Sequence, residues 1–324
     1  METEKPNTKL LSMLGMAGSM FGVGLMSLAA ERDDIIVLSA DMSTPAGLDK
    51  FKASYPDRFI NVGIAEQNMI GIAAGLADEG YVPVCVAQAC FISMRAFEQV
   101  RQFAGYMNGR IILVGIGAGL SLQYMGNTHF AIEDMALMRT IPGMTVVSPC
   151  DAYEAIMTLT AAISSPGPVY IRLNAGLGSP VVYNEPYKFI IGKAHQLMDG
   201  DDVQIIATGS MVHVALQVAD DLSARGVNAN VVNMHTIKPI DDSIVNCRAR
   251  LAVTIEEHSV IGGLGSAMAE VLINTCPQPR LLTIGVDDRF LQVGSYNYLL
   301  EQAGLTVEQI VRTIMKELTD NKPD

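Results

Sequence analysis

Short apolar runs alternate with helical patterns along the chain, and this alternation limits the fold more than any other feature. Segments 66–78, 93–107 and 151–164 of the first half have helical patterns. Runs that are apolar throughout are typical of parallel strands covered by helices on both faces. The first half therefore predicts an α/β domain. Its expected strands are IIVLSA from Ile35, VPVCVA from Val82, RIILVGI from Arg110, MTVVSP from Met144 and PVYIRL from Pro168.

The pattern breaks at a stretch rich in glycine, proline and turn residues, and then resumes. This stretch predicts a linker at 181–194, with room for an edge hairpin, between domains at 1–180 and 195–324. The 324 residues are enough for two domains that each bury a core. The fold class we expect is α/β, with two consecutive domains of mainly parallel sheets. The second series has the runs VQIIAT, ANVVNM, LAVTIEE and RLLTIGV, with helices expected at 210–225, 263–274 and 306–318.

Charge and cysteine content exclude several classes of partner. The formal net charge is −12, and no basic run interrupts it, so we expect no nucleic-acid partner and no anionic membrane surface. The five cysteines are scattered and form no CxxC pair, which argues against a zinc site and favours a reducing cytoplasm. A small molecule or another protein is the expected partner.

The uncharged segment from Leu10 to Ala30 is long enough to cross a bilayer, and Gly18 and Gly22 have the spacing of a membrane-helix contact. A membrane span or a signal peptide is therefore an alternative. Glycines and serines dilute this segment, the residues before it are of mixed charge, and a buried-strand pattern follows it. We expect a soluble helix packed against a sheet.

Two polar residues stand at the ends of expected strands. Glu66 separates an apolar run from a helix of small residues, and His129 lies in the loop GNTHFAIED after another run. Open α/β sheets bind ligands at the carboxyl ends of parallel strands. Each residue also has a structural alternative, a helix-dipole carboxylate for Glu66 and a backbone-bonded loop imidazole for His129. The glycine clusters lack the spacing of known phosphate loops.

Four successive motifs resemble those of the transketolase family of thiamine-diphosphate enzymes, which includes deoxyxylulose phosphate synthase. The resemblance implies a pyrimidine-binding domain followed by the family's carboxyl-terminal domain, and transfer of a two-carbon ketol unit from a ketose to an aldose. The motifs are RFINVGIAEQNMIGIAAGLADEGYVPV, MRAFEQVR, GNTHFAIEDMALMRTIPGMTVVSPCD and TIEEHSVIGGLGSAMAEVL.

The resemblance gives Glu66 a catalytic role, which is to hydrogen-bond the pyrimidine nitrogen N1′ of the cofactor and thereby favour its imino tautomer. Phe91 matches, after a one-residue gap, the aromatic ring that stacks on the aminopyrimidine. Asp41 resembles an aspartate near the cofactor. Ile64, in the same stretch as Glu66, belongs to the implied cofactor site.

The resemblance also implies a substrate site. His129 matches the histidine that contacts sugar oxygens, and Arg172 matches the arginine that grips the sugar phosphate. Two positions depart from the family, because Gly117 replaces a histidine or arginine and Met125 replaces an aspartate. We therefore expect substrates other than the ordinary pentose-phosphate pair.

The family binds the diphosphate through Mg²⁺ on a separate domain with a GDG motif, and this chain has no such motif. The resemblance thus implies an amino-terminal partner subunit that carries the diphosphate and magnesium site, with no metal ligands on this chain. An assembly of two copies of each chain is expected by analogy. A sugar or sugar phosphate is the expected substrate, and the cytoplasm is the expected location.

Three alternatives remain open at this point. The chain could be part of a split synthase that joins pyruvate to an aldehyde, although Ala175 stands where the deoxyxylulose enzymes have a further arginine. It could be the β subunit of a 2-oxo acid dehydrogenase, which usually has a different histidine loop. It could also be a regulatory module that keeps the fold without catalysis.

Overall fold

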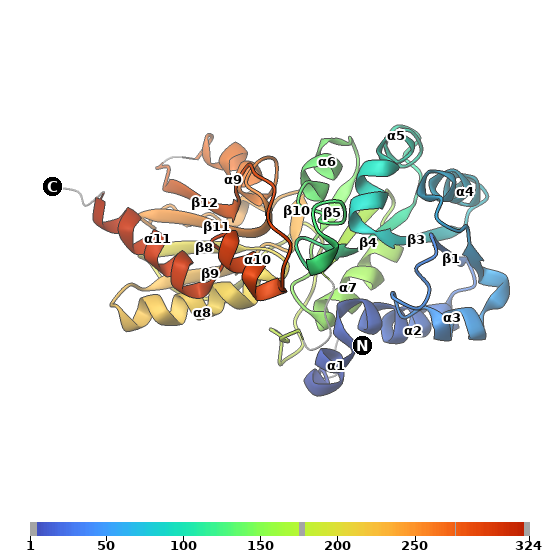
Figure 1. The fold of residues 1–324 in the computed structure, drawn as a ribbon, viewed down its shortest axis with the longest axis horizontal. Coiled ribbons are helices and arrows are strands. Elements are labelled where there is room, and N and C mark those ends of the chain that lie inside the picture. Colours follow the sequence, from blue (N-terminus) through green and yellow to red (C-terminus); the bar gives the residue numbers. More distant parts are fainter. Residues whose placement is uncertain (1–4, 175–178, 276, 321–324) are drawn as a thin grey trace.

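The structure, a computed structural model, describes residues 5–174, 179–275 and 277–320. It contains two α/β domains with mainly parallel sheets (Figure 1), so the predicted fold class is confirmed. The first sheet has the strand order β10-β5-β6-β4-β3-β1-β2, and only β10 runs antiparallel to its neighbour. Its strands are β1 (Ile35–Ser39), β2 (Phe59–Asn61), β3 (Val82–Gln88), β4 (Ile112–Ala118), β5 (Thr145–Val147), β6 (Val169–Asn174) and β10 (Thr236–Lys238).

Helices cover both faces of the first sheet because its central strands are apolar on both sides. Val37 packs into the layer under the first helices, whereas the next residue, Leu38, packs into the layer under α4 and α6. One layer contains α1 (Thr8–Ser19), a wide π turn (Met20–Leu25), α2 (Met26–Glu31), α3 (Asp49–Ser54) and α7 (Ala152–Ile163). The other contains α4 (Glu66–Asp78), the helical segment 91–106 with α5 (Phe97–Gln99) at its centre, and α6 (Asp134–Thr140).

The apolar segment near the amino terminus forms the helix Thr8–Glu31, which is long and apolar enough to cross a membrane. In this structure it lies along the first sheet (Figure 1), and Met20, Phe21 and Leu25 are fully buried in the core. The packing agrees with the predicted core helix. Gly15 interrupts the helix, with φ 66° and ψ −177°.

The second sheet has the order β12-β11-β8-β9-β7, with β7 antiparallel at one edge. Residues 181–194, predicted as the linker, contain no strand. The first strand after the linker pairs with β9. The strands are β7 (His195–Met198), β8 (Val203–Ala207), β9 (Ala229–Asn233), β11 (Leu251–Ser259) and β12 (Arg280–Val286), and the helices are α8 (Met211–Ala224), α9 (Leu264–Leu272), α10 (Tyr296–Gln302) and α11 (Val307–Asp320).

Strand β10 connects the domains in a way that the sequence did not predict. It follows β9 of the second sheet but pairs with β5 at the edge of the first sheet, where Thr236 is opposite Val147. Immediately beside it, the Ser148 amide donates a hydrogen bond of 2.7 Å to the His235 carbonyl. The second half of the chain therefore completes the first sheet.

Candidate functional site

Four of the predicted site residues follow four neighbouring strands of the first sheet. His129 follows β4, Phe91 follows β3, Asp41 follows β1, and Glu66 follows β2. These strands are parallel, so their carboxyl ends meet at one edge of the sheet, where open α/β sheets bind ligands. The order of the strands, rather than proximity in sequence, places these side chains along one edge.

Glu66, Phe91 and His129 form a contact cluster together with Arg95, a residue that the sequence did not single out. The Arg95 Nη1 atom donates a hydrogen bond of 2.8 Å to Glu66 Oε2. Its guanidinium carbon lies 3.9 Å from the centre of the Phe91 ring, in cation–π contact. The ring of Phe91 meets that of His129 edge to face, with centroids 5.3 Å apart.

Burial differs sharply between the two ends of this ion pair. Glu66 begins α4, where the helix dipole favours a carboxylate, and its side chain is only 3% exposed. The Arg95 side chain is 43% exposed. An exposed cation on a long flexible stem can leave, whereas the carboxylate is fixed by its helix, so the cluster can exchange Arg95 for another hydrogen-bond donor.

The two remaining residues of the implied cofactor site lie at the rim. Asp41 is exposed and has a positive φ of 56°, and its amide donates to the Asn61 side chain over 3.1 Å. Ile64 is 77% exposed, an unusual environment for a large apolar side chain. Both therefore stay predictions, because neither side chain joins the contacts of Glu66, Phe91 and His129.

Arg172 lies apart from this cluster, in the interior of the chain. Its side chain is 1% exposed, and its Nε pairs with Asp134 at 3.0 Å. Its Nη2 donates to the carbonyls of Ala131 and Glu257. These contacts make Arg172 a buried link between the domains, and they do not favour the predicted grip on a sugar phosphate.

The loop that carries His129 is held by the second domain through Glu257 of β11. This carboxylate is 1% exposed, and its Oε1 accepts a hydrogen bond of 2.6 Å from the Leu120 amide. Burial raises its pKa, and the hydroxyls of Ser210 and Tyr296, which donate to Oε2, oppose the rise. Asn174 Nδ2 donates to the same oxygen over 3.0 Å. The sequence motif around Glu257 gave no sign of these partners.

Two further contacts fix the same loop. Asn127 Nδ2 donates to the Leu291 carbonyl over 2.8 Å, and the Leu291 amide donates back to Asn127 Oδ1 over 3.2 Å. The Ala136 amide donates to His258 Nε2, while His258 Nδ1 donates to the Ser259 carbonyl. The second domain thus anchors the loop before His129 and the first turn of α6 after it.

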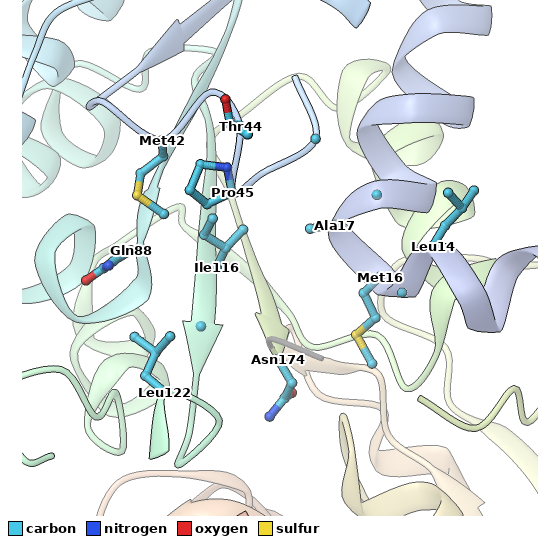
Figure 2. Close-up of a pocket in the computed structure, with 14 residues that line it drawn as sticks. Leu14, Met16, Ala17, Met42, Thr44, Pro45, Gln88, Ile116, Leu122 and Asn174 are labelled. Carbon is cyan, nitrogen blue, oxygen red and sulfur yellow. The ribbon is translucent and has the colours of Figure 1, made fainter. Parts of the chain in front are cut away.

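A pocket of about 430 Å³ opens at the same edge of the sheet (Figure 2). It is bounded by the ends of β3, β4 and β6, by the loop after β1, and by the helix break at Gly15. The backbone of this wall favours glycine at position 117, because φ there is +72° and an added Cβ would lie 2.9 Å from Leu122. The side chains labelled in Figure 2 are Leu14, Met16, Ala17, Met42, Thr44, Pro45, Gln88, Ile116, Leu122 and Asn174.

Comparison with protein families identifies both halves of the chain. Residues 17–179 match the transketolase pyrimidine-binding domain, and residues 192–310 match the transketolase C-terminal domain. The chain is 42% identical over 303 residues to a 6-deoxy-6-sulfo-D-fructose transketolase subunit of Clostridium sp. (strain MSTE9), covering 92% of each chain. It is 34% identical over 295 residues to an apulose-4-phosphate transketolase subunit of Phocaeicola vulgatus, covering 90% of this chain and 94% of the relative.

Among solved structures, a split-gene transketolase described as an inactive β4 tetramer matches with a TM-score of 0.86 and 40% identity. The match covers 94% of this chain and 98% of that one. The family domains, the relatives and this neighbour agree with the resemblance found in the sequence. The chain belongs to the transketolase family, as a subunit of the split type that combines the pyrimidine-binding and carboxyl-terminal domains.

Proposed function

We propose that this chain is the carboxyl-terminal subunit of a two-chain transketolase. The enzyme transfers a two-carbon ketol unit from a ketose to an aldose with thiamine diphosphate as cofactor. The observation that carries the proposal is the cluster in which the buried Glu66 carboxylate and the Phe91 ring share one exposed cation, Arg95.

The chemistry of this cluster fits the pyrimidine half of the cofactor. An aromatic face suits a flat heteroaromatic ring, and a buried carboxylate suits a ring nitrogen that must share a proton. Arg95 now makes both contacts, and its exposed side chain can turn outward to release Phe91 and Glu66. Phe91 would then support the ring and Glu66 would bond its nitrogen.

The chain's own residues would position and protonate the reactants. When bound, thiamine diphosphate supplies the nucleophilic carbon that the two-carbon transfer requires. Glu66 would hold or release a proton at its carboxylate, and its fixed position on α4 orients that proton. His129 touches the Phe91 ring edge to face, so its imidazole stands where it could exchange protons with sugar oxygens.

The two relatives are named for different sugars, 6-deoxy-6-sulfo-D-fructose and apulose 4-phosphate, so the family fold accommodates varied substrates. Gly117 and the half-exposed Met125 supply no polar group where the family has polar ones. Substrates other than the ordinary pentose-phosphate pair are therefore part of the proposal.

A partner chain is required for the diphosphate end of the cofactor. The solved split-gene neighbour is described as an inactive tetramer of its β chain, which supports a need for a second subunit. We place Mg²⁺ and the diphosphate site on that partner, in an assembly of two copies of each chain, and we place the enzyme in the cytoplasm.

The test is to tag the chain, purify it gently from its host with Mg²⁺ and thiamine diphosphate, and identify stoichiometric partners by mass. We expect a partner with a GDG motif and a downstream asparagine, and ketol transfer by the purified pair. A chain that runs alone and binds no cofactor would contradict the proposal and favour a regulatory role.

A further inference from the structure

The pocket of Figure 2 contains no ionisable side chain among the described residues that line it. Methionine, leucine, isoleucine, proline and alanine side chains form most of its wall, and Thr44, Gln88 and Asn174 are its polar members. A phosphate site normally needs a cation or several converging donors, because a buried anion without a partner is strongly destabilised. The lining therefore argues against a phosphate ligand.

The cation nearest in sequence to this wall does not supply the missing charge. Arg172 belongs to β6, two residues before Asn174, but its Nε is paired with Asp134 and its side chain is 1% exposed. A cationic residue in place of Gly117 would be strained in this structure, because of the positive φ and the close approach of Leu122. Helix α1 resumes beside the pocket after Gly15, and a helix start provides only roughly half a positive charge.

The polar groups of the pocket include two acceptors that have no donor. Gln88 Oε1 and Asn174 Oδ1 are buried and make no hydrogen bond within the part of the chain that the structure describes. The orientation of the Asn174 amide is fixed, because its Nδ2 faces the Ala118 carbonyl and Glu257 Oε2, which both accept. Thr44 already donates its hydroxyl to Asp49. Both oxygens are covered by other atoms of the protein, so a ligand meets a wall whose polar members are neutral amides and a hydroxyl. Such groups suit the hydroxyls of a ligand better than an anion.

The position of the pocket connects it with the reacting groups. Gln88 ends β3 only three residues before Phe91, and Leu122 lies in the loop that leads to His129. We propose that this pocket receives the end of the sugar remote from the transferred carbons, and that this end bears hydroxyls and no phosphate. The proposal rests on the transketolase function proposed above.

The experiment uses the chain in complex with its purified partner, Mg²⁺ and thiamine diphosphate. Hydroxypyruvate is the two-carbon donor, so each turnover joins the ketol unit to an aldehyde and releases carbon dioxide. D-Glyceraldehyde and D-glyceraldehyde 3-phosphate are compared as acceptors through kcat/KM. We expect a value at least tenfold higher for the unphosphorylated aldehyde, and a higher value for the phosphorylated one would overturn the proposal.

Charge-adding variants test the pocket itself. Leu122→Arg should shift the kcat/KM ratio at least tenfold toward the phosphorylated acceptor. Tyr124→Arg adds the same charge to the same loop at a side chain that is 71% exposed and outside the pocket lining, so its ratio should stay at the wild-type value. Thr44→Lys, at the exposed rim, gives a second test if Leu122→Arg does not fold.

The outcomes separate the two levels of the proposal. The pocket assignment is contradicted if both Leu122→Arg and Thr44→Lys remain active and keep the wild-type ratio of kcat/KM between the two acceptors. That result leaves the transketolase function in place. A cofactor-loaded complex that consumes neither acceptor, nor any ketose offered as donor, contradicts the function and the pocket assignment with it.

Discussion

Asn127 and Leu291 exchange two hydrogen bonds across the domains, one in each direction, although 164 residues separate them. The side chain of Asn127 stands two residues before His129, and both partner groups on Leu291 belong to the backbone. A loop of the first domain is therefore held at its tip by a backbone segment of the second.

Asn127→Ala should loosen the His129 loop without unfolding the chain. Loss of two hydrogen bonds at a partly exposed site weakens local stability by about 1–2 kcal/mol. We expect faster amide hydrogen exchange at residues 120–130 in the isolated chain, and kcat/KM of the complex reduced about tenfold. Tyr124→Ala, an exposed change in the same loop, is the control. Unchanged exchange in Asn127→Ala would show that the Leu291 contact does not hold the loop.

Glu66→Gln should separate catalysis from stability. The variant keeps the shape of the side chain but cannot hold a proton as a carboxylate does, so we expect activity of the complex to fall at least 100-fold. Stability should change by less than about 1 kcal/mol, because the Arg95 end of the pair is substantially exposed. Steady-state kinetics and urea unfolding measure the two quantities. Activity near that of the wild type would remove the role assigned to Glu66.

Arg172→Met tests whether this arginine acts in the structure or on the substrate. Its removal leaves Asp134 as a buried charge without its partner, which typically costs about 3–5 kcal/mol of stability. We expect this loss in urea unfolding of the isolated chain, with no sugar present, and partial recovery in Arg172→Met with Asp134→Leu. A stable Arg172→Met chain with a raised KM for phosphorylated sugars would instead favour the phosphate-binding role.

His258 should make the chain less stable in mild acid. Burial lowers its pKa from the ordinary 6.5 to about 4, and Nε2 already accepts the Ala136 amide, so the folded state holds the imidazole neutral. The unfolded chain binds the proton more readily than the folded chain. The free energy of unfolding therefore has its full value above pH 6.5 and falls as the pH drops toward 4. The change is up to about 3 kcal/mol for this residue.

Urea unfolding at several pH values measures this slope. His258→Gln, which can still accept from Ala136, should reduce the slope between pH 6.5 and 4. His235, whose pKa burial also lowers to about 4, accounts for part of the slope that remains. An identical pH profile in the wild type and in His258→Gln would show that His258 does not titrate in this way.

The sequence predicted the fold class and the helix Glu66–Asp78, because apolar runs and helical periods are local signals. It also predicted that Glu66 and His129 would follow strands. It missed Arg95, because an arginine on a helix gives no sign of which carboxylate it will meet. The resemblance gave Arg172 the role of gripping the sugar phosphate. The sequence did not show its burial, because that depends on Asp134 and on a domain far away in sequence.

The hydrogen-bond partners of Glu257 could not be predicted from the sequence either. A carboxylate in a strand is expected to be a surface charge. Only the approach of the end of β11 to Leu120 and to Asn174, the last residue of β6, makes it an acceptor for both. Strand β10 could not be predicted either. Its three residues are too few to show an alternation of apolar and polar side chains, and it pairs with β5 of the first sheet although it follows β9 of the second.

Strand β10 also limits how this protein can be taken apart or rearranged. A gene cut at the linker would release a first domain that lacks one border strand and exposes the backbone of β5, a surface on which chains associate wrongly. The two halves are therefore expected to melt in a single transition and to resist expression as separate pieces. In evolution, the subunit would be exchanged, fused or split off as one block.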